Sequence, residues 1–126
     1  MILPDTSIWI DHFRQANPVL QSLLEDGQIL CHQFVVGELA CGSLRAREST
    51  MQLLQTLECA PLAEQEEVLA LVTGQRLMAT GIGWLDAYLL SSVLLAKAEL
   101  WTLDQPLARV SHKLGVAATL GMSGER

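Results

Sequence analysis

The sequence predicts an α/β fold in which helix dominates and the strands are short and parallel. Short apolar segments alternate along the chain with longer segments whose apolar residues recur at helical spacing. This alternation is typical of a parallel sheet, because successive parallel strands are joined through helices. The chain has 126 residues, of which 50% are hydrophobic, so it can build a core of its own. We expect one domain over residues 1–126.

Near the N-terminus we expect a strand, two helices and a second strand. The apolar pair Ile2-Leu3 predicts the first strand, and a hydroxyl residue after Asp5 can cap a short helix. The dipeptide Asn17-Pro18 opens the second helix, because asparagine suits an N-cap and proline suits the first turn, and Gly27 ends it. Residues 28–31 predict the second strand.

The middle of the chain predicts four consecutive helices. Apolar residues at three- and four-residue spacing place them over residues 33–44, 46–57, 64–79 and 85–97. The last of these is apolar almost all round, which predicts that it is buried. Residues 59–62 predict an extended link between the second and third helices, and two glycines interrupt the chain before the fourth.

The C-terminal part of the chain predicts a further strand and helix. Residues 99–102 predict the strand. The run Asp104-Gln105-Pro106 opens a helix that Gly115 ends, and residues 116–120 predict a last short strand.

The charge balance restricts the possible functions. The chain carries 14 acidic and 8 basic residues, which argues against a nucleic-acid binder that relies on a basic surface alone. A nucleic-acid enzyme stays possible, since cations bound to carboxylates restore attraction for phosphate. The longest charge-free runs have eleven residues, against about 20 for a membrane span, and the N-terminus lacks the basic start of a signal peptide. We expect a cytoplasmic protein without a membrane segment, whose three cysteines are reduced core residues: Cys31, Cys41 and Cys59.

Four acids stand alone inside apolar runs, whereas most of the others lie in polar stretches. They are Asp5, Glu38, Asp86 and Asp104. Burial of an unpaired carboxylate is costly, so each needs a partner or a metal. Two of the four follow predicted strands and two lie on helices that begin at the same sheet edge, where ligands bind in parallel sheets. Such a cluster suits Mg²⁺ or Mn²⁺, which can activate water for attack on a phosphodiester.

Each of these acids also has a structural alternative. Asp5 and Asp104 can cap helices, and Asp86 can be a first-turn acid that the helix dipole favours. Glu38 can pair with an arginine. The residues by themselves leave a metal site and these structural roles both open.

The order of the four acidic motifs resembles the PIN-domain family, and within it the VapC-type ribonuclease toxins of bacterial toxin–antitoxin pairs. The motifs are MILPDTSIWIDHF, VVGELACG, GIGWLDAYLLSS and LWTLDQPLARVSHKLGV. The resemblance covers nearly the whole chain. It implies a three-layer α/β/α fold with a short-stranded, central, mostly parallel sheet flanked by helices.

The resemblance implies a metal-dependent endoribonuclease that hydrolyses RNA by metal-activated water and leaves 5′-phosphate and 3′-hydroxyl ends. The four acids would be catalytic and would bind Mg²⁺ or Mn²⁺ directly or through water. The hydroxyls of Thr6, Thr102 and Ser7 would orient a carboxylate or a water. Leu107 stands where many relatives carry a further acid, which predicts that a second metal binds weakly or only with substrate present.

The resemblance also implies partners. We expect an RNA substrate, a homodimer, and an inhibitory VapB-like antitoxin in a groove between the N-terminal helices and the helices around residues 34–57. Three tryptophans can stack on bases, with core packing as the alternative, above all for the last: Trp9, Trp84 and Trp101. Four arginines can contact phosphate, with a solvated surface position as the default: Arg14, Arg45, Arg47 and Arg76.

Two other functions remain as alternatives. One is a catalytically inactive PIN module that acts only by binding protein or RNA. The other is a phosphatase of the haloacid-dehalogenase type with Asp5 as nucleophile. The phosphatase is disfavoured, because such enzymes need a second aspartate where Ser7 stands.

Overall fold

The computed structural model describes residues 1–120. Within this range the strands are β1 (Ile2–Pro4), β2 (Leu30–Cys31), β3 (Glu58–Cys59) and β4 (Glu99–Trp101). The helices are α1 (Thr6–Arg14), α2 (Pro18–Glu25), α3 (Gln33–Cys41), α4 (Arg47–Thr56), α5 (Gln65–Gly74), α6 (Trp84–Ala96) and α7 (Gln105–Lys113).

The strands pair in parallel, as predicted. β1 pairs with β4 so that Leu3 lies opposite Leu100, and β2 pairs with β3 so that Cys31 lies opposite Cys59. A parallel bridge between Ile2 and residue 29 joins the two pairs, which gives the spatial order β3-β2-β1-β4. The chain thus crosses over after each strand, and the C-terminal ends of β1 and β4 lie side by side.

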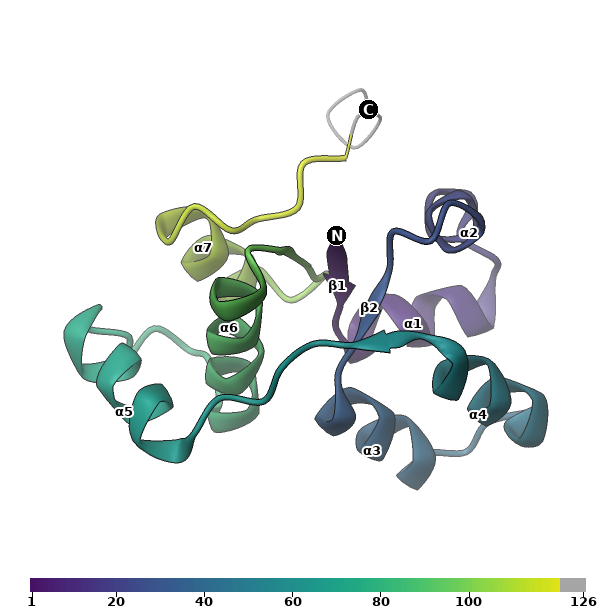
Figure 1. The fold of residues 1–126 in the computed structure, drawn as a ribbon, viewed down its shortest axis with the longest axis horizontal. Helices are drawn as coiled ribbons and strands as arrows, with labels where there is room; N and C mark the ends of the chain where they lie inside the picture. The colour runs from purple at the N-terminus through teal and green to yellow at the C-terminus, as the bar shows by residue number, and fades with distance from the viewer. Residues whose placement is uncertain (121–126) are drawn as a thin grey trace.

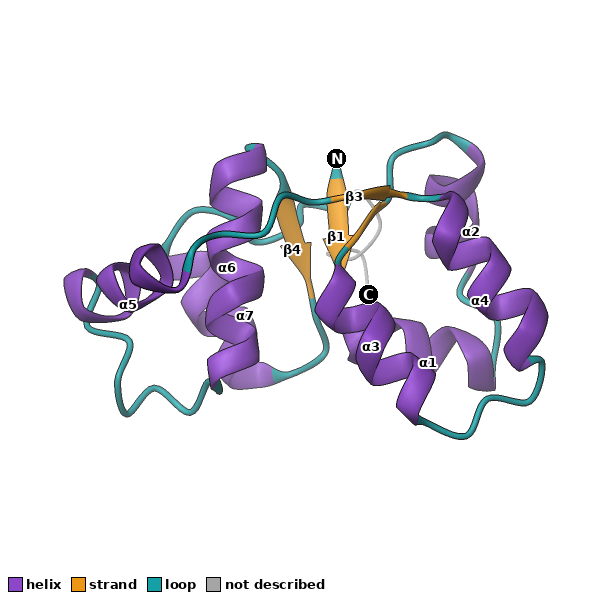
Figure 2. Cartoon of the chain, turned by 60° about the horizontal axis from the view of Figure 1, so that its bottom comes forward, coloured by secondary structure: helices purple, strands orange, loops and turns teal. Residues whose placement is uncertain are grey.

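Helices cover both sides of the strands. Figures 1 and 2 show α1–α4 on one side and α5–α7 on the other, which agrees with the expected α/β fold. The core between them contains fully buried side chains from both halves of the chain, among them Leu3, Trp9, Leu90 and Leu100. All residues from Ala87 to Val93 of α6 are buried, as its apolar sequence predicts.

Several predicted bounds are wrong where tertiary contacts decide. α3 ends at Cys41, before the predicted residue 44, and α5 ends at Gly74, because Arg76 turns the chain with a φ of 55°. The predicted link at residues 59–62 begins as a strand, since Glu58–Cys59 pairs with β2. The predicted strand at 116–120 is reduced to one bridge between Leu100 and Ala117.

The prediction that all three cysteines belong to the core is wrong for two of them. Cys31 is buried, whereas Cys41 and Cys59 are exposed. Cys41 is the last residue of α3, and Cys59 lies in the short outer strand β3, whose two residues are both exposed. Within residues 1–120, no helix has the length and apolar character needed to cross a membrane.

Candidate active site

The four singled-out acids line one cavity of about 190 Å³, which we call the acidic cavity. They come from four different places in the chain: the end of β1, the middle of α3, the first turn of α6 and the residue before α7. The remaining wall consists of Thr6, Phe34, Val35, Leu85 and Leu89. The topology therefore gathers the acids at one end of the parallel strands, as the sequence predicts.

Asp5 is the most firmly held of the four acids. Its side chain is only 6% exposed, and it caps α1, so the alternative in which Thr6 or Ser7 is the cap is wrong. Oδ1 accepts hydrogen bonds from the Ser7 backbone N–H at 3.0 Å and the Ser7 hydroxyl at 2.5 Å. Oδ2 accepts one from the Thr102 hydroxyl at 2.5 Å. These donors supply the hydrogen bonds that a buried carboxylate needs in place of water.

Glu38 and Asp104 are exposed, so the expectation that all four acids are buried is wrong. Glu38 Oε1 accepts a hydrogen bond from the Thr6 hydroxyl at 2.5 Å. Asp104 Oδ2 accepts one from the Leu107 backbone N–H at 3.0 Å and thereby caps α7. Apolar residues near these two acids in the sequence pack into the core, while the carboxylates themselves reach the open cavity.

Asp86 is partly buried and is the third residue of α6. Its Oδ2 accepts a hydrogen bond from the Gly83 backbone N–H at 2.9 Å, which closes the N-terminus of the helix. Burial raises the pKa of this carboxyl, and the Gly83 hydrogen bond acts against that rise. The negative charges of Asp104, Asp5 and Glu38 raise the pKa further, in that order. The acids of the cavity therefore repel one another.

The structural alternatives are partly observed and leave the acids free for further ligands. Asp5, Asp86 and Asp104 do take part in helix caps, whereas Glu38 bonds a threonine in place of the suggested arginine. No lysine or arginine within residues 1–120 donates a hydrogen bond to any of the four. One oxygen each of Glu38, Asp86 and Asp104 accepts no hydrogen bond from the described chain.

This donor set can be compared with what a metal needs. Among the described residues, no three His, Cys, Asp or Glu side chains are grouped closely enough to hold one ion between them. The four acids nevertheless offer the oxygen ligands that Mg²⁺ prefers, and Mg²⁺ takes only one or two carboxylates and keeps several waters. The cavity therefore fits a hard divalent cation held partly through water.

His32 is a positioning residue that inspection of the sequence alone did not single out for this purpose. Its ring is fully buried. Nδ1 accepts a hydrogen bond from the Phe34 backbone N–H at 3.0 Å and caps α3, while Nε2 lies 3.0 Å from the hydroxyl of Ser92 in α6. Burial lowers the pKa of His32 to about 4. The neutral ring thus connects α3, which carries Glu38, to α6, which carries Asp86. The sequence signal for this role was a histidine at the position just before a predicted helix.

Comparison with known proteins agrees with this geometry. Residues 2–113 match the sequence model of the PIN domain family. Two relatives, both named Ribonuclease VapC32, come from Mycobacterium tuberculosis strains CDC 1551 / Oshkosh and ATCC 25618 / H37Rv. Each is 45% identical to this chain over 118 residues, which cover 93% of this chain and 95% of the relative. The chain therefore belongs to the PIN domain family, as the order of its four acidic motifs predicts.

Proposed function

We propose that this protein is an endoribonuclease toxin of the VapC type that uses Mg²⁺ or Mn²⁺ to hydrolyse RNA phosphodiester bonds. The observation that carries the proposal is the meeting of four acids from separate segments around one cavity. The relatives named Ribonuclease VapC32 support the same reaction class. The unpaired oxygens and the mutual repulsion of the acids support a cation as their shared partner.

The residues of the chain divide the work. Asp5 is fixed by Ser7 and Thr102 and forms the rigid part of the binding site. Glu38 is oriented by Thr6, and Asp86 and Asp104 are oriented by their helix caps, each with one oxygen left for a cation or its water. When bound, the cation would activate water and neutralise phosphate charge. Cleavage would leave 5′-phosphate and 3′-hydroxyl ends.

The position of Leu107 supports weak binding of a second cation. Its side chain lies on the buried face of α7, is fully buried in the core and offers no oxygen to the cavity. Asp104 is therefore the only acid that residues 104–107 supply. We infer that the site saturates with one tightly held cation.

A groove beside the acidic cavity suits an antitoxin. It has a volume of about 520 Å³, lies between α1 and the α3–α4 region, and includes Glu38 in its wall. Its lining combines apolar side chains with two cations: Ile10, Phe13, Leu39, Leu44, Arg14 and Arg45. We infer that a VapB-like antitoxin places an apolar segment in this groove. Glu38 lines both the groove and the acidic cavity, so a basic side chain of the antitoxin can reach the acids and inhibit the enzyme.

Two further expectations complete the proposal. We infer one PIN-like domain over residues 1–126, supported by a family match that spans residues 2–113. We also infer a homodimer, for which the exposed Leu94 and Leu95 of α6 offer apolar surface. Light scattering measures the mass of the purified protein, and a monomer at all concentrations would contradict the dimer.

Cleavage of total cellular RNA tests the proposed function. Purified protein is incubated with RNA in Mg²⁺, in Mn²⁺ and with a chelator, and the new ends are mapped. We expect discrete 5′-phosphate ends that appear only with metal. Folded, antitoxin-free protein that cuts no RNA in either metal would overturn the proposal and favour a module that only binds protein or RNA.

A further inference from the structure

A second, apolar pocket begins within one helical turn of the acidic cavity. It has a volume of about 190 Å³, and we call it the Trp84 pocket. Its wall contains Val72, Leu77, Met78, Ile82, Trp84 and Ala87. Gly83 of this pocket donates its backbone N–H to Oδ2 of Asp86 in the acidic cavity at 2.9 Å, so the walls of the two sites are in direct contact.

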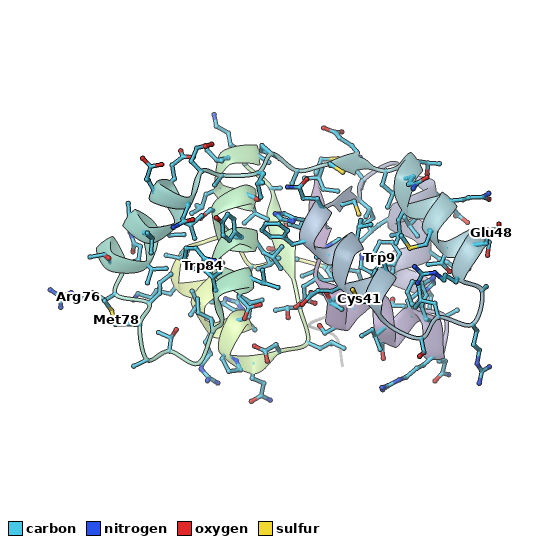
Figure 3. All side chains as sticks on the ribbon, turned by 90° about the horizontal axis from the view of Figure 1, so that it is seen from below. Trp9, Cys41, Glu48, Arg76, Met78 and Trp84 are labelled. Atoms are coloured by element: carbon cyan, nitrogen blue, oxygen red, sulfur yellow. The ribbon has the colours of Figure 1, made fainter. Side chains whose placement is uncertain are left out.

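Two large side chains of the Trp84 pocket are exposed. Trp84 is 44% exposed and Met78 is 56% exposed, whereas Trp9 is fully buried in the core. Figure 3 shows Trp84, Met78 and Arg76 on the same side of the molecule, far from Glu48. A large aromatic and a thioether left open beside a polar site are typical of a ligand-binding surface.

Contacts with other aromatic rings hold the indole of Trp84 in place. It packs edge-to-face on Tyr88 with ring centroids 5.0 Å apart, and Tyr88 packs in the same manner on Phe34 at 5.1 Å. Phe34 in turn lines the acidic cavity. A ring oriented in this way loses little conformational entropy when a second ring stacks on it.

Three basic residues lie in the loop that carries Met78 or on the helix α7 beside it. Lys113 donates to the Gln75 carbonyl at 2.8 Å, and a Cβ at Gly81 would lie 3.2 Å from Pro106, so this loop packs along α7. Arg109 lies one turn beyond Pro106 on that helix, and the exposed Arg76 lies in the loop itself. In a chain with a net charge of −6, these cations favour a ligand that carries phosphate beside its apolar part.

We propose that the Trp84 pocket binds an unpaired nucleobase of the RNA, next to the phosphodiester held at the acidic cavity. The inference rests on the proposed function, because that function supplies the RNA. Single-stranded RNA offers the three features that the pocket matches, namely a flat base for Trp84, phosphates for Arg76 and Arg109, and a backbone that continues to the acids. Stacking of this kind tolerates several bases and prefers large ones, so we expect purines to bind more tightly than pyrimidines.

Fluorescence anisotropy with labelled oligo(A) and oligo(U) tests the proposal. All variants carry Asp104→Asn, so that RNA stays intact in Mg²⁺. We expect Trp84→Ala to weaken oligo(A) binding about tenfold, because one stacked base is lost, and Trp84→Phe to keep most of the affinity. Leu53→Ala is the matched control, since Leu53 is 39% exposed in α4, on the other side of the strands. It should bind as the parent does.

A second comparison does not depend on how well Trp84→Ala folds. A series of oligo(A) molecules carries one abasic nucleotide, each at a different position. The parent protein should bind the series member that lacks the stacked base less tightly than intact oligo(A). Met78→Ala should weaken binding of the intact oligo(A). Equal affinity of the parent for intact and abasic RNA at every position would overturn the pocket.

The failures of the two proposals are distinguishable. If the chain with an intact Asp104 cuts RNA in Mg²⁺ and Trp84→Ala changes neither its KM nor RNA affinity, the nucleobase proposal fails and the proposed function stands. If no metal supports cleavage while Trp84→Ala still weakens RNA binding, the proposed function fails and the pocket stands. Loss of a dimer on Trp84→Ala, with RNA affinity unchanged, would identify the pocket as an interface between copies and overturn the proposal.

Discussion

The hydroxyl of Thr102 donates a 2.5 Å hydrogen bond to Oδ2 of Asp5, although 97 residues separate the two in the chain. The same hydroxyl oxygen accepts a hydrogen bond from the Asp104 backbone N–H at 3.0 Å. Pairing of β1 with β4 brings these residues together at the end of the strands. One threonine therefore sets the position of two of the four acids.

Replacing Thr102 by valine removes this link while keeping the shape of the side chain. We expect Thr102→Val to lower the rate of RNA cleavage by about 10–100-fold, because Asp5 loses its orienting donor. It should also lower the free energy of unfolding by about 1–3 kcal/mol, since a buried carboxylate oxygen is left without a partner. Thr102→Ser should restore both. Cleavage kinetics and urea unfolding measure the effects, and full activity of Thr102→Val would contradict the positioning role.

Asp86→Asn should stabilise the metal-free protein and at the same time abolish RNA cleavage. The pKa of Asp86 is raised by burial and by the neighbouring acids, so its ionised form destabilises the metal-free protein above the ordinary carboxyl pKa. The amide keeps an oxygen for the Gly83 N–H but carries no charge. In chelator at neutral pH we expect Asp86→Asn to melt at a higher temperature than the parent, with the difference vanishing in acid, and to lose RNA cleavage. A lower melting temperature at neutral pH would refute this reading.

The buried His32 should make the protein acid-sensitive. Its pKa is lowered from an ordinary 6.5 to about 4, so the stability that it contributes is complete above pH 6.5 and is lost as the pH falls toward 4. The shift corresponds to about 3 kcal/mol. Urea unfolding over this pH range should show a smaller decline for His32→Asn than for the parent. The exposed His112 provides the control, because His112→Gln should leave the decline unchanged.

Two glycines should respond in opposite directions to alanine. Gly81 has a φ of +92°, and a Cβ there would meet Pro106 at 3.2 Å. Gly81→Ala should therefore reduce the free energy of unfolding by about 1–3 kcal/mol. Gly37 lies exposed within α3 with nothing within 4 Å of a Cβ, so Gly37→Ala should add about 0.5–1 kcal/mol. Thermal and urea unfolding measure both, and equal effects would contradict the packing of this loop on α7.

Local signals in the sequence predicted those parts of the fold that local chemistry determines. The bounds of α2 follow from Asn17, whose side chain accepts from two backbone N–H groups, from Pro18, and from Gly27 with its positive φ. The early end of α5 coincides with Gly74, but the residue that turns the chain in the left-handed region is Arg76 and not a glycine. Its conformation depends on packing of the following loop against α7, which the sequence does not display.

The candidate site, too, was only partly predictable from the sequence. The strand and helix pattern brought the four acids to one sheet edge, because parallel strands present their C-terminal ends together. Exposure of Glu38 was not predictable, since it depends on which face of α3 the rest of the chain covers. The contact of His32 with Ser92 joins residues 60 positions apart, and only the packed helices reveal it.

Cleavage of RNA by a panel of acid variants, as a function of Mg²⁺ concentration, tests the central claim most directly. The panel contains Asp5→Asn, Glu38→Gln, Asp86→Asn and Asp104→Asn. The matched control is Glu48→Gln, which changes an exposed acid of α4 far from Trp84 and its neighbours in Figure 3. We expect each of the four to lose cleavage or to need much more Mg²⁺, while Glu48→Gln cuts RNA as the parent does. Retention of metal-dependent cleavage by all four variants would contradict the assignment of the acidic cavity as the active site.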